Sequence, residues 1–306
     1  MIDWPELLEQ TRQHVQPHLG EGAVADYIPA LAAADPRAFA LSVATIDGDV
    51  HSVGDFEQPF SIQSISKVFT LALALEREGD QLWRRVGREP SGSPFNSIVQ
   101  LEHEDGVPRN PLINAGAFVV TDALLCDDGG DAIEQLLSLL RGLSDDERID
   151  VDAAVAESEA AWGHRNRGMA WFMKSFGVLR SDPERVLDAY FRQCAVAMST
   201  AQLARAGLFL ANEGVHPVTG ARVASHDRVN RINALMMTCG HYDMSGDFAF
   251  RVGLPGKSGV GGGILATAPG VASIAVWSPA LNAAGNSSAG TLALEFLSAG
   301  AGLNLF

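Results

Sequence analysis

The chain has 306 residues, of which 47% are hydrophobic and 19% are charged, a composition typical of a globular protein rather than a disordered one. Its formal net charge of -15 at pH 7 argues against nucleic acid and anionic membranes as partners. Neither a run of about 18 apolar residues nor a basic leader with an apolar core occurs, so we expect no spanning helix and no signal peptide. The three cysteines, Cys126, Cys194 and Cys239, form no Cys-x-x-Cys pair, which suits a reducing compartment and favours a cytoplasmic protein.

Two local patterns open the chain. Asp3-Trp4-Pro5-Glu6 combines a capping acid, a proline in the first turn and a glutamate three residues after the cap, which predicts a helix that ends near Pro17. Residues 39–55 read as two strands around Asp47-Gly48, and an Asp-Gly pair between such runs is typical of a β-hairpin. The chain is therefore expected to begin with a helix and a hairpin.

The middle of the chain differs in pattern from its end. From residue 64 to about residue 235 the pattern is mostly helical, interrupted by loops rich in Pro, Gly and Asn. Three strand-like runs follow at residues 248–254, 257–267 and 271–278, and Pro269-Gly270 is expected to turn between the last two. Residues 292–297 are expected to form a closing helix.

Strands thus come from both chain ends and helices from the middle, which favours an α+β fold with one antiparallel sheet flanked by the terminal helices. We expect a single domain over residues 1–306. Its sheet subdomain would comprise residues 1–60 and 240–306, and its mostly helical subdomain residues 61–239. A catalytic cleft would lie between the two parts.

A serine and a lysine three residues apart stand at the start of an apolar stretch. Residues i and i+3 share a helix face, so Ser64 and Lys67 are placed to touch. Between residues 68 and 75 only Thr70 is not apolar, which predicts a buried helix and a lysine whose pKa is lowered by desolvation. A neutral amine can take a proton from a serine, so the pair is a candidate nucleophile and base. A helix-capping serine beside a snorkelling lysine is the structural alternative.

A second motif, far along the chain, favours the chemical interpretation. Lys257-Ser258-Gly259 is followed by Val260-Gly261-Gly262-Gly263 in a late strand-like run. An early Ser-x-x-Lys combined with a late Lys-Thr/Ser-Gly is the signature of the penicillin-recognising serine hydrolases. The two motifs together, in this order, predict a serine hydrolase of that kind.

Several blocks between about residue 24 and residue 263 extend this likeness. In chain order they are Val24-Ala25-Asp26-Tyr27-Ile28-Pro29, residues 60–67, Asn110-Pro111-Leu112-Ile113-Asn114-Ala115-Gly116-Ala117, Glu157-Ser158-Glu159 with Arg165-Asn166, Tyr190-Phe191-Arg192-Gln193-Cys194, Gly240-His241-Tyr242-Asp243, and residues 253–260. With these blocks the chain resembles the serine-dependent glutaminases, the L-glutamine amidohydrolases of the β-lactamase-like superfamily, in their short bacterial form. The ankyrin repeats of the animal forms have no counterpart in it.

The resemblance implies a β-lactamase and penicillin-binding-protein-like fold and the hydrolysis of L-glutamine to L-glutamate and ammonia, with no cofactor and no metal ion. In this interpretation Ser64 attacks the side-chain amide carbon and leaves an acyl-enzyme for water to hydrolyse. Lys67 and Tyr242 are the two candidate proton carriers, and the sequence does not assign the steps between them. The backbone N–H groups of Ser64 and Val260 would form the oxyanion hole.

The ammonium and the carboxylate of such a substrate need partners when they are buried. Glu159 is the expected partner of the ammonium. The resemblance implies a substrate-binding site made of Tyr27, Gln63, Ser64, Asn114, Glu159, Asn166, Tyr190, Tyr242 and Val260. Each side chain also has a purely structural interpretation, such as a helix cap for an asparagine or half-buried core for a tyrosine.

Two other functions stay open at this point. A β-lactamase or peptidase of the same superfamily is disfavoured because the chain contains neither a Ser-Asp-Asn nor a Tyr-x-Asn triplet and because we expect no signal peptide. A catalytically inactive amino-acid sensor is disfavoured because all the candidate catalytic residues are present. L-glutamine is the expected small-molecule partner, and the family suggests a homodimer or homotetramer.

Three further patterns are discounted. Residues 259–263 superficially match a nucleotide-binding loop, but its third glycine would fall on Ile264 and a strand follows. His14 and His18 have ligand spacing on a helix, but Pro17 interrupts them and no third ligand is nearby. Asn286-Ser287-Ser288 matches a glycosylation sequon, which has no meaning in a cytoplasmic protein.

Overall fold

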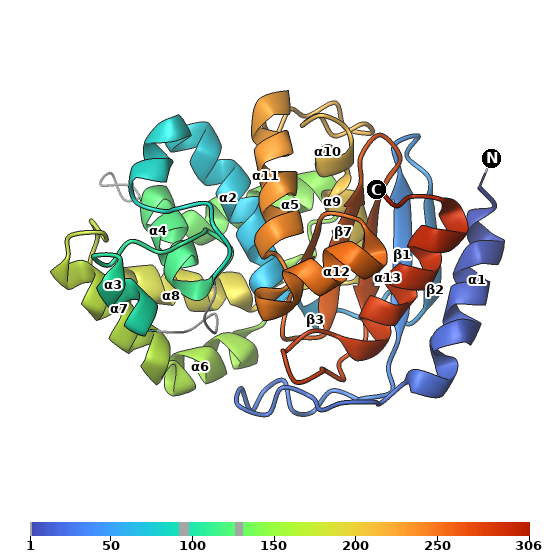
Figure 1. Ribbon diagram of the computed structural model, residues 1–306, viewed down its shortest axis with the longest axis horizontal. Coiled ribbons are helices and arrows are strands. Elements are labelled where there is room, and N and C mark those ends of the chain that lie inside the picture. The colour runs from blue at the N-terminus through green and yellow to red at the C-terminus, as the bar shows by residue number, and fades with distance from the viewer. Residues whose placement is uncertain (1, 92–97, 126–130) are drawn as a thin grey trace.

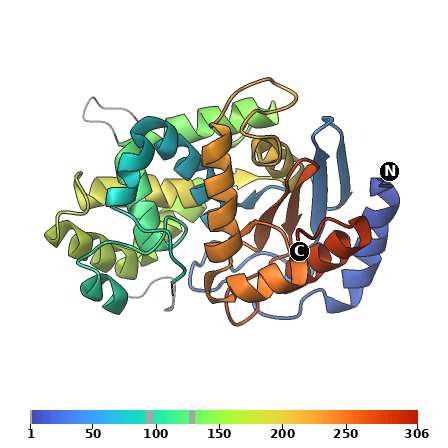
Figure 2. The same cartoon turned by 45° about the horizontal axis from the view of Figure 1, so that its top comes forward.

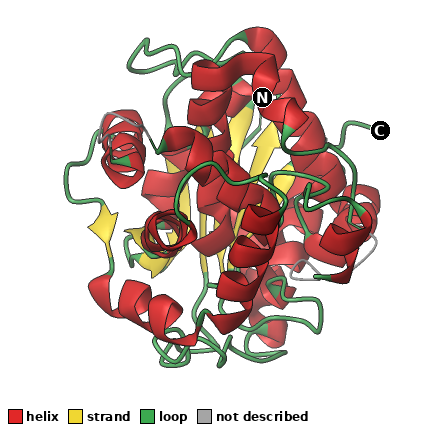
Figure 3. Ribbon diagram, turned by 90° about the vertical axis from the view of Figure 1, so that its left-hand side faces the viewer, coloured by secondary structure: helices red, strands yellow, loops and turns green. Residues whose placement is uncertain are grey.

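The computed structural model describes residues 2–91, 98–125 and 131–306. The strands near the two chain ends gather on the right of Figure 1, and helices from the central segment lie beside them on the left. The same side-by-side arrangement is seen after a turn of 45° (Figure 2). From the side, the strands lie between helices (Figure 3). The α+β class predicted from the sequence is confirmed.

The main sheet has five strands in the order β2-β1-β8-β7-β6, and every neighbouring pair is antiparallel. The hairpin predicted at residues 39–55 is confirmed as β1 and β2, in which Val43 lies opposite His51 and Gly48 has a φ of 96° in the turn. The sheet therefore joins strands from both ends of the chain. Its strands are β1 (Ala40–Thr45), β2 (Val50–Gly54), β6 (Gly256–Ser258), β7 (Gly263–Ala268) and β8 (Ala272–Trp277).

Side-chain alternation along the strands gives this sheet two different faces. Leu41, Val43 and Ile274 belong to one buried cluster, whereas Ala40 and Ala275 belong to another. Helices from the chain ends cover the first face (Figure 1); they are α1 (Trp4–Val15), α12 (Ser245–Val252) and α13 (Ser288–Ala301).

The helices at both chain ends begin at side-chain caps. Asp3 Oδ1 accepts a hydrogen bond from Glu6 N at 3.2 Å, and Ser287 Oγ accepts one from Gly290 N at 3.1 Å. The helix predicted to start at Asp3 is confirmed as α1. The closing helix is also confirmed, and it is longer than the predicted residues 292–297 because it extends from its Ser287 cap to Ala301.

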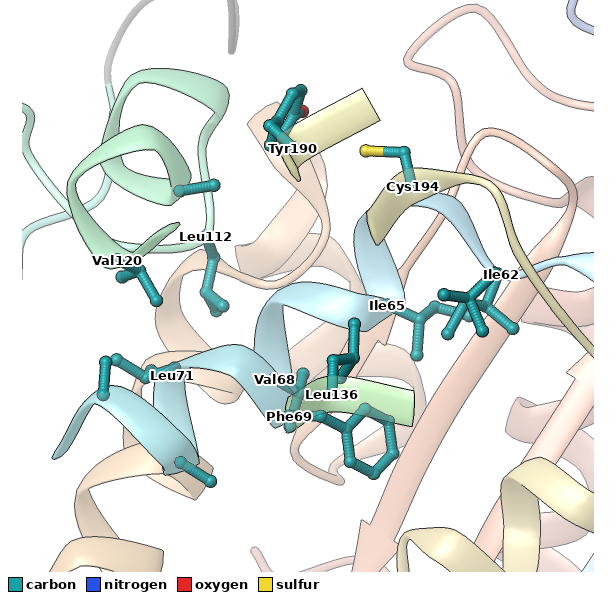
Figure 4. Close-up of a cluster of buried hydrophobic side chains, with 14 of the residues drawn as sticks. Ile62, Ile65, Val68, Phe69, Leu71, Leu112, Val120, Leu136, Tyr190 and Cys194 are labelled. Atoms are coloured by element: carbon teal, nitrogen blue, oxygen red, sulfur yellow. The ribbon is translucent and has the colours of Figure 1, made fainter. Parts of the chain in front are cut away.

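The second face of the sheet is packed by the helices α9 (Thr200–Ala206) and α10 (Leu208–Ala211) of the central segment. Helix α2 (Ser66–Glu78) passes through the same buried cluster, where Phe69 and Leu136 are both fully buried (Figure 4). We propose that residues 1–306 form one domain, with the sheet part and the helical part divided as predicted. The sharing of one buried cluster by the central helices and the sheet supports a single domain.

The remaining helices lie mostly away from the main sheet. They are α3 (Val99–His103), α4 (Asn114–Leu124), α5 (Ala132–Ser144), α6 (Ala153–Trp162), α7 (His164–Ser175), α8 (Pro183–Cys194) and α11 (His226–Cys239). A second sheet has the order β3-β5-β4, with the strands β3 (Phe60–Ser61), β4 (Asp150–Val151) and β5 (Val196–Met198). The sequence did not predict these strands because each has only two or three residues, too few for a visible alternation.

The prediction of a strand at residues 248–254 is wrong. Apolar residues alternate there, but most of the run belongs to helix α12. Phe248 and Val252, four residues apart, are buried, whereas Phe250 between them is 86% exposed. Gly253, with a φ of 68°, then ends the helix.

The run predicted as one strand at residues 257–267 is divided. A turn at residues 259–262 separates β6 from β7, and the two pair with each other as a hairpin. The turn predicted at Pro269-Gly270 is confirmed between β7 and β8, where Gly270 has a φ of 74°. The glycine-rich segment thus forms a tight turn at the edge of the sheet.

Two expectations concern the environment of the protein. Of the helices in residues 2–91, 98–125 and 131–306, none is long and apolar enough to cross a membrane. Cys194 and Cys239 are buried free thiols, and Cys126 lies outside the described residues.

Candidate active site

The predicted nucleophile lies where β3 leads into α2. Ser64 belongs to the short 3-10 helix Gln63–Ile65 and is 6% exposed. Lys67 projects from the first turn of α2 and is 1% exposed. Its Nζ donates a hydrogen bond to Ser64 Oγ at 3.0 Å. The contact expected from the spacing of three residues between Ser64 and Lys67 is therefore present.

The direct contacts of the Lys67 amine are with neutral groups. Its Nζ donates a second hydrogen bond, to Asn114 Oδ1 at 2.7 Å, and lies 5.6 Å from the centre of the Tyr190 ring. The ion pairs of the described residues do not include it. Burial lowers the pKa of Lys67 to about 8, although the nearby Cys194 and Glu159 act in the opposite direction. Part of the amine is therefore neutral near pH 7 and can accept a proton.

Backbone strain marks two residues of the site. Within the described part of the chain five non-glycine residues have a positive φ, and two of them are Gln63 at 49° and Tyr242 at 53°. Such conformations cost of order 1–3 kcal/mol and persist only where the surroundings fix them. Gln63 Nε2 donates to Ser61 Oγ at 3.0 Å, and Gln63 O accepts from Ser66 Oγ at 2.7 Å. These contacts hold the residue that immediately precedes the nucleophile.

Tyr242 approaches Ser64 from another part of the chain. It begins the 3-10 helix Tyr242–Met244, and its buried hydroxyl lies close enough to the Ser64 and Ser258 side chains for both to act on its pKa. Burial raises the pKa of Tyr242 to about 12, so the phenol keeps its proton near neutral pH. The amine of Lys257, whose pKa burial lowers well below its usual value, lies 4.7 Å from the centre of the Tyr242 ring and donates a hydrogen bond to the carbonyl oxygen of Gly240 at 3.0 Å.

The turn between β6 and β7 approaches the backbone beside the nucleophile. A Cβ on Gly259 would lie 2.6 Å from the carbonyl oxygen of Ile62, and a Cβ on Gly261 would lie 2.3 Å from that of Ser61. Only glycine permits this approach at either position. Val260 stands between the two glycines and is 7% exposed.

Two backbone donors are unoccupied at this point of the fold. Within the described protein, the N–H groups of Ser64 and Val260 donate to no acceptor. The turn is close to the first of them, because a Cβ on Gly259 would lie 3.3 Å from Ser64 N. Buried N–H groups without a partner are rare, so both are available to an oxygen atom of a bound molecule.

A cavity of about 210 Å³ opens above Ser64. It is smaller than the roughly 300–1,000 Å³ of sites that hold drug-sized ligands, so it suits a substrate of amino-acid size. Its lining comprises Tyr27, Ile28, Gln63, Ser64, Asn114, Glu159, Trp162, Gly163, Arg165, Asn166, Tyr190, Tyr242 and Val260.

Glu159 is the carboxylate of this cavity. It lies on α6, is 7% exposed, and burial raises its pKa to about 7, against the effects of a hydrogen bond from Gln63 and the charge of Lys67. An arriving ammonium group would favour the charged form of this carboxylate. The site therefore offers a cation partner whose charge depends on pH within the physiological range.

Neutral hydrogen-bonding groups make up most of the remaining wall. Asn114 Nδ2 donates to Asn166 Oδ1 at 3.1 Å, which links α4 to α7. Tyr190 on α8 is 2% exposed, whereas Tyr27 is 55% exposed and stands at the entrance. The cavity thus has a buried floor and an open rim.

The structure brings together every site residue predicted from the sequence. Nine of them line the cavity, and Lys67 contacts Ser64 from behind it. Four lining residues were not predicted: Ile28, Trp162, Gly163 and Arg165. Ile28 and Arg165 lie inside the blocks that define the resemblance, and Trp162 and Gly163 lie between Glu159 and Arg165, so membership of a block or proximity to one is the signal that could have identified them. In the described part of the chain no group of three or more His, Cys, Asp or Glu side chains could hold a metal ion.

Comparison with known proteins identifies the family. A family model described as Glutaminase matches residues 22–306. The chain is 57% identical to a glutaminase of Rhizobium rhizogenes, over 100% of this chain and 99% of the relative. It is 58% identical, with the same coverage, to a thermolabile glutaminase of Rhizobium etli. The chain belongs to the glutaminase family.

Solved structures agree with this assignment. The probable glutaminase ybaS has a TM-score of 0.91 and 41% identity, with 98% of each chain covered. A probable glutaminase of Bacillus subtilis has a TM-score of 0.90 and 33% identity, with 98% of this chain and 97% of that one covered. The glutamate form of Mglu has a TM-score of 0.93 and 37% identity, over 100% of this chain and 70% of the other. The predicted β-lactamase-like fold and the predicted glutaminase identity are confirmed.

Proposed function

We propose that this glutaminase hydrolyses L-glutamine to L-glutamate and ammonia through an acyl-enzyme on Ser64. The observation that carries the proposal is the contact of Ser64 with a buried lysine of lowered pKa, at the floor of a small cavity that also contains Glu159. The family supports the substrate, and the geometry supports the roles of the individual residues.

In the first step Ser64 Oγ attacks the amide carbon of the substrate side chain. Neutral Lys67 takes the serine proton across the 3.0 Å contact. Asn114 Oδ1 fixes the direction of Nζ, because it accepts a hydrogen bond from the amine at 2.7 Å. The carbonyl oxygen of the substrate becomes an oxyanion as the new C–O bond forms.

The oxyanion is placed against the N–H groups of Ser64 and Val260. Both are free of acceptors within the described protein, and the short 3-10 helix and the glycine turn fix them before substrate arrives. One such donor is typically worth about 2.7–4 kcal/mol in the transition state.

Ammonia leaves when the C–N bond breaks, and the nitrogen then needs one more proton. The Tyr242 hydroxyl, which is protonated near neutral pH, supplies that proton and becomes a phenolate, while Lys67 keeps the proton it took from Ser64. The phenolate then takes a proton from the water that attacks the ester, which restores the Tyr242 hydroxyl. As the ester C–O bond breaks and glutamate leaves, Lys67 returns its proton to Ser64 Oγ, which restores the resting enzyme.

The rest of the cavity recognises the amino-acid end of the substrate. Glu159 pairs with the ammonium group, and its charge is stabilised by that pairing. Neutral polar side chains of the lining bind the carboxylate and the side-chain amide of the substrate. They are the amides of Asn114, Asn166 and Gln63 and the hydroxyls of Tyr27 and Tyr190. The size of the cavity sets the length of side chain that can place its amide over Ser64.

The experiment measures ammonia release from L-glutamine, L-asparagine and D-glutamine, with a chromogenic cephalosporin as the test for β-lactamase chemistry. The proposal predicts turnover of L-glutamine and no opening of the cephalosporin. Turnover of the cephalosporin would assign a penicillin-type hydrolase, and tight binding of L-glutamine without turnover would assign an amino-acid sensor.

We also propose that this glutaminase acts as a homodimer or homotetramer in the cytoplasm. The family supports the assembly, and the sparse free thiols Cys194 and Cys239 support the compartment. Light scattering coupled to size-exclusion chromatography measures the assembly directly, and a monomer at micromolar concentration would contradict it.

A further inference from the structure

Asn286, the first residue of the discounted sequon, forms hydrogen bonds inside the protein. Its side chain is 2% exposed in the loop between β8 and α13, so it is not an acceptor for a sugar. Both ends of its amide are occupied. Oδ1 accepts a hydrogen bond from Ser258 Oγ at 2.6 Å, and Nδ2 donates one to the carbonyl oxygen of His241 at 3.3 Å.

Both partners of Asn286 adjoin Tyr242. His241 precedes Tyr242 in the chain, and the Ser258 side chain lies close enough to the Tyr242 hydroxyl to act on its pKa. Asn286 thereby links the backbone just before Tyr242 to the Ser258 side chain, which lies beside the Tyr242 hydroxyl.

The loop that carries Asn286 is itself fixed. Asn282 Oδ1 accepts from Asn286 N at 3.1 Å, and Asn282 N donates to Asn286 O at 2.8 Å. A Cβ on Gly285 would lie 3.8 Å from Cε2 of Tyr242 and 3.9 Å from Cγ1 of Val260, which is contact distance. The loop therefore packs directly behind the tyrosine ring and the turn that carries a proposed oxyanion donor.

Tyr242 needs such support because its backbone is strained. With a φ of 53° it relaxes into a commoner conformation unless its neighbours hold it. We propose that Asn286 is a positioning residue of the reaction, which holds the Tyr242 hydroxyl against Ser64 without contacting the substrate. The inference rests on the proposed function, in which Tyr242 transfers a proton.

The chemistry of the amide explains why the position calls for asparagine. The carbonyl oxygen of His241 can only accept, so it must face Nδ2, and this leaves Oδ1 to accept the proton of Ser258. Aspartate has the same shape but offers no donor to His241. Alanine offers neither group.

The test measures kcat and KM for L-glutamine in Asn286→Ala and Asn286→Asp, each alone and combined with Tyr242→Phe. Asn286→Asp keeps the side-chain shape, so it can be used to test the inference if the alanine variant does not fold. The matched control is Asn233→Ala, a buried asparagine on α11 that does not line the cavity and whose Nδ2 donates to the carbonyl oxygen of Leu210 at 3.0 Å. Thermal unfolding of each variant measures the purely structural effect.

The inference predicts that kcat falls by about 10²-fold in Asn286→Ala, the typical effect of displacing a reacting group by about 1 Å, while KM stays within about twofold. In the Tyr242→Phe background the same substitution should cost no further activity. Asn233→Ala should lower the melting temperature and leave kcat unchanged. An undiminished kcat in both Asn286 variants, or a loss that multiplies with that of Tyr242→Phe, would overturn the inference. A fully active Tyr242→Phe enzyme would instead refute the tyrosine's role in the proposed function.

Discussion

Lys67 Nζ donates a hydrogen bond to Asn114 Oδ1 at 2.7 Å, and this acceptor is a neutral amide oxygen rather than a carboxylate. The amine therefore has a hydrogen-bond partner that orients it without stabilising its positive charge as strongly as an anion would. This relationship explains how a fully buried lysine can have a pKa of about 8 and still point at Ser64.

Asn114→Asp tests this relationship. A carboxylate at 2.7 Å favours the ammonium form, so the pKa of Lys67 should rise by about 1–3 units and the acid limb of the kcat profile should move to higher pH by that amount. Steady-state kinetics over a pH series measure the shift. The neutral variant Asn114→Ser serves as the control, and an acid limb at the wild-type position in Asn114→Asp would be inconsistent with Lys67 as the base.

The wild-type pH profile follows from the same residue. Only neutral Lys67 can take the proton of Ser64, and its pKa is about 8, so kcat should rise with pH and level off above about pH 8. Acidification protonates the amine, so about a tenth of the maximal rate should remain at pH 7. A kcat that stays flat down to about pH 5 would contradict this role.

Two substitutions of Lys67 separate basicity from charge. Lys67→Met removes the base and should lower kcat by about 10²–10⁴-fold. Lys67→Arg keeps a cation that cannot lose its proton, so it should be as inactive as the methionine variant. Appreciable turnover by Lys67→Arg would mean that the charge, not the basicity, assists the reaction.

Glu159→Gln should act mainly on substrate binding. Loss of the anionic partner of the ammonium should raise KM by about 10–100-fold and change kcat much less. In the wild type the carboxylate has a pKa of about 7, so its charge is present above that pH and KM should rise as the pH falls below it. Glu157→Gln, an exposed neighbour on the same helix, is the control. Equal KM values in the two variants would exclude the ammonium pairing.

The glycine turn predicts a contrast between two Gly→Ala substitutions. In Gly261→Ala the new Cβ would meet the carbonyl oxygen of Ser61 at 2.3 Å, so the turn must shift and both kcat and stability should fall, the latter by about 1–3 kcal/mol. In Gly142→Ala, on the exposed side of α5, nothing lies within 4 Å of the new Cβ. That variant should be fully active and more stable by about 0.5–1 kcal/mol. Chemical denaturation measures both, and an active Gly261→Ala would show that the close approach is not needed.

Local spacing in the sequence predicted the parts of the site that are close in the chain. Ser64 and Lys67 are three residues apart, and a helix converts that spacing into contact. The contact between Lys67 and Asn114 joins residues 47 positions apart, and no periodicity encodes it. The resemblance supplied Asn114 as a site residue, but only the structure shows that it orients the amine.

The misread run at residues 248–254 has a physical cause. Phe248, Phe250, Val252 and Leu254 alternate as in a strand, yet Phe248 and Val252 also have the i, i+4 spacing of a helix. A short run fits both periods, and packing of α12 beside α13 decided between them. Arg165 belongs to a block of the resemblance without being predicted as a site residue, and no pattern in the sequence marks Trp162 as part of the lining.

The most direct test of the Ser64 acyl-enzyme is the rate of ammonia release by Ser64→Ala at saturating L-glutamine, with the folded state of the variant checked by its melting temperature. Removal of a catalytic nucleophile typically costs many orders of magnitude, so kcat should fall by at least about 10³-fold in a variant that still folds and binds glutamine. Retention of more than about a tenth of the wild-type rate would contradict the account, because it would mean that Ser64 forms no covalent intermediate.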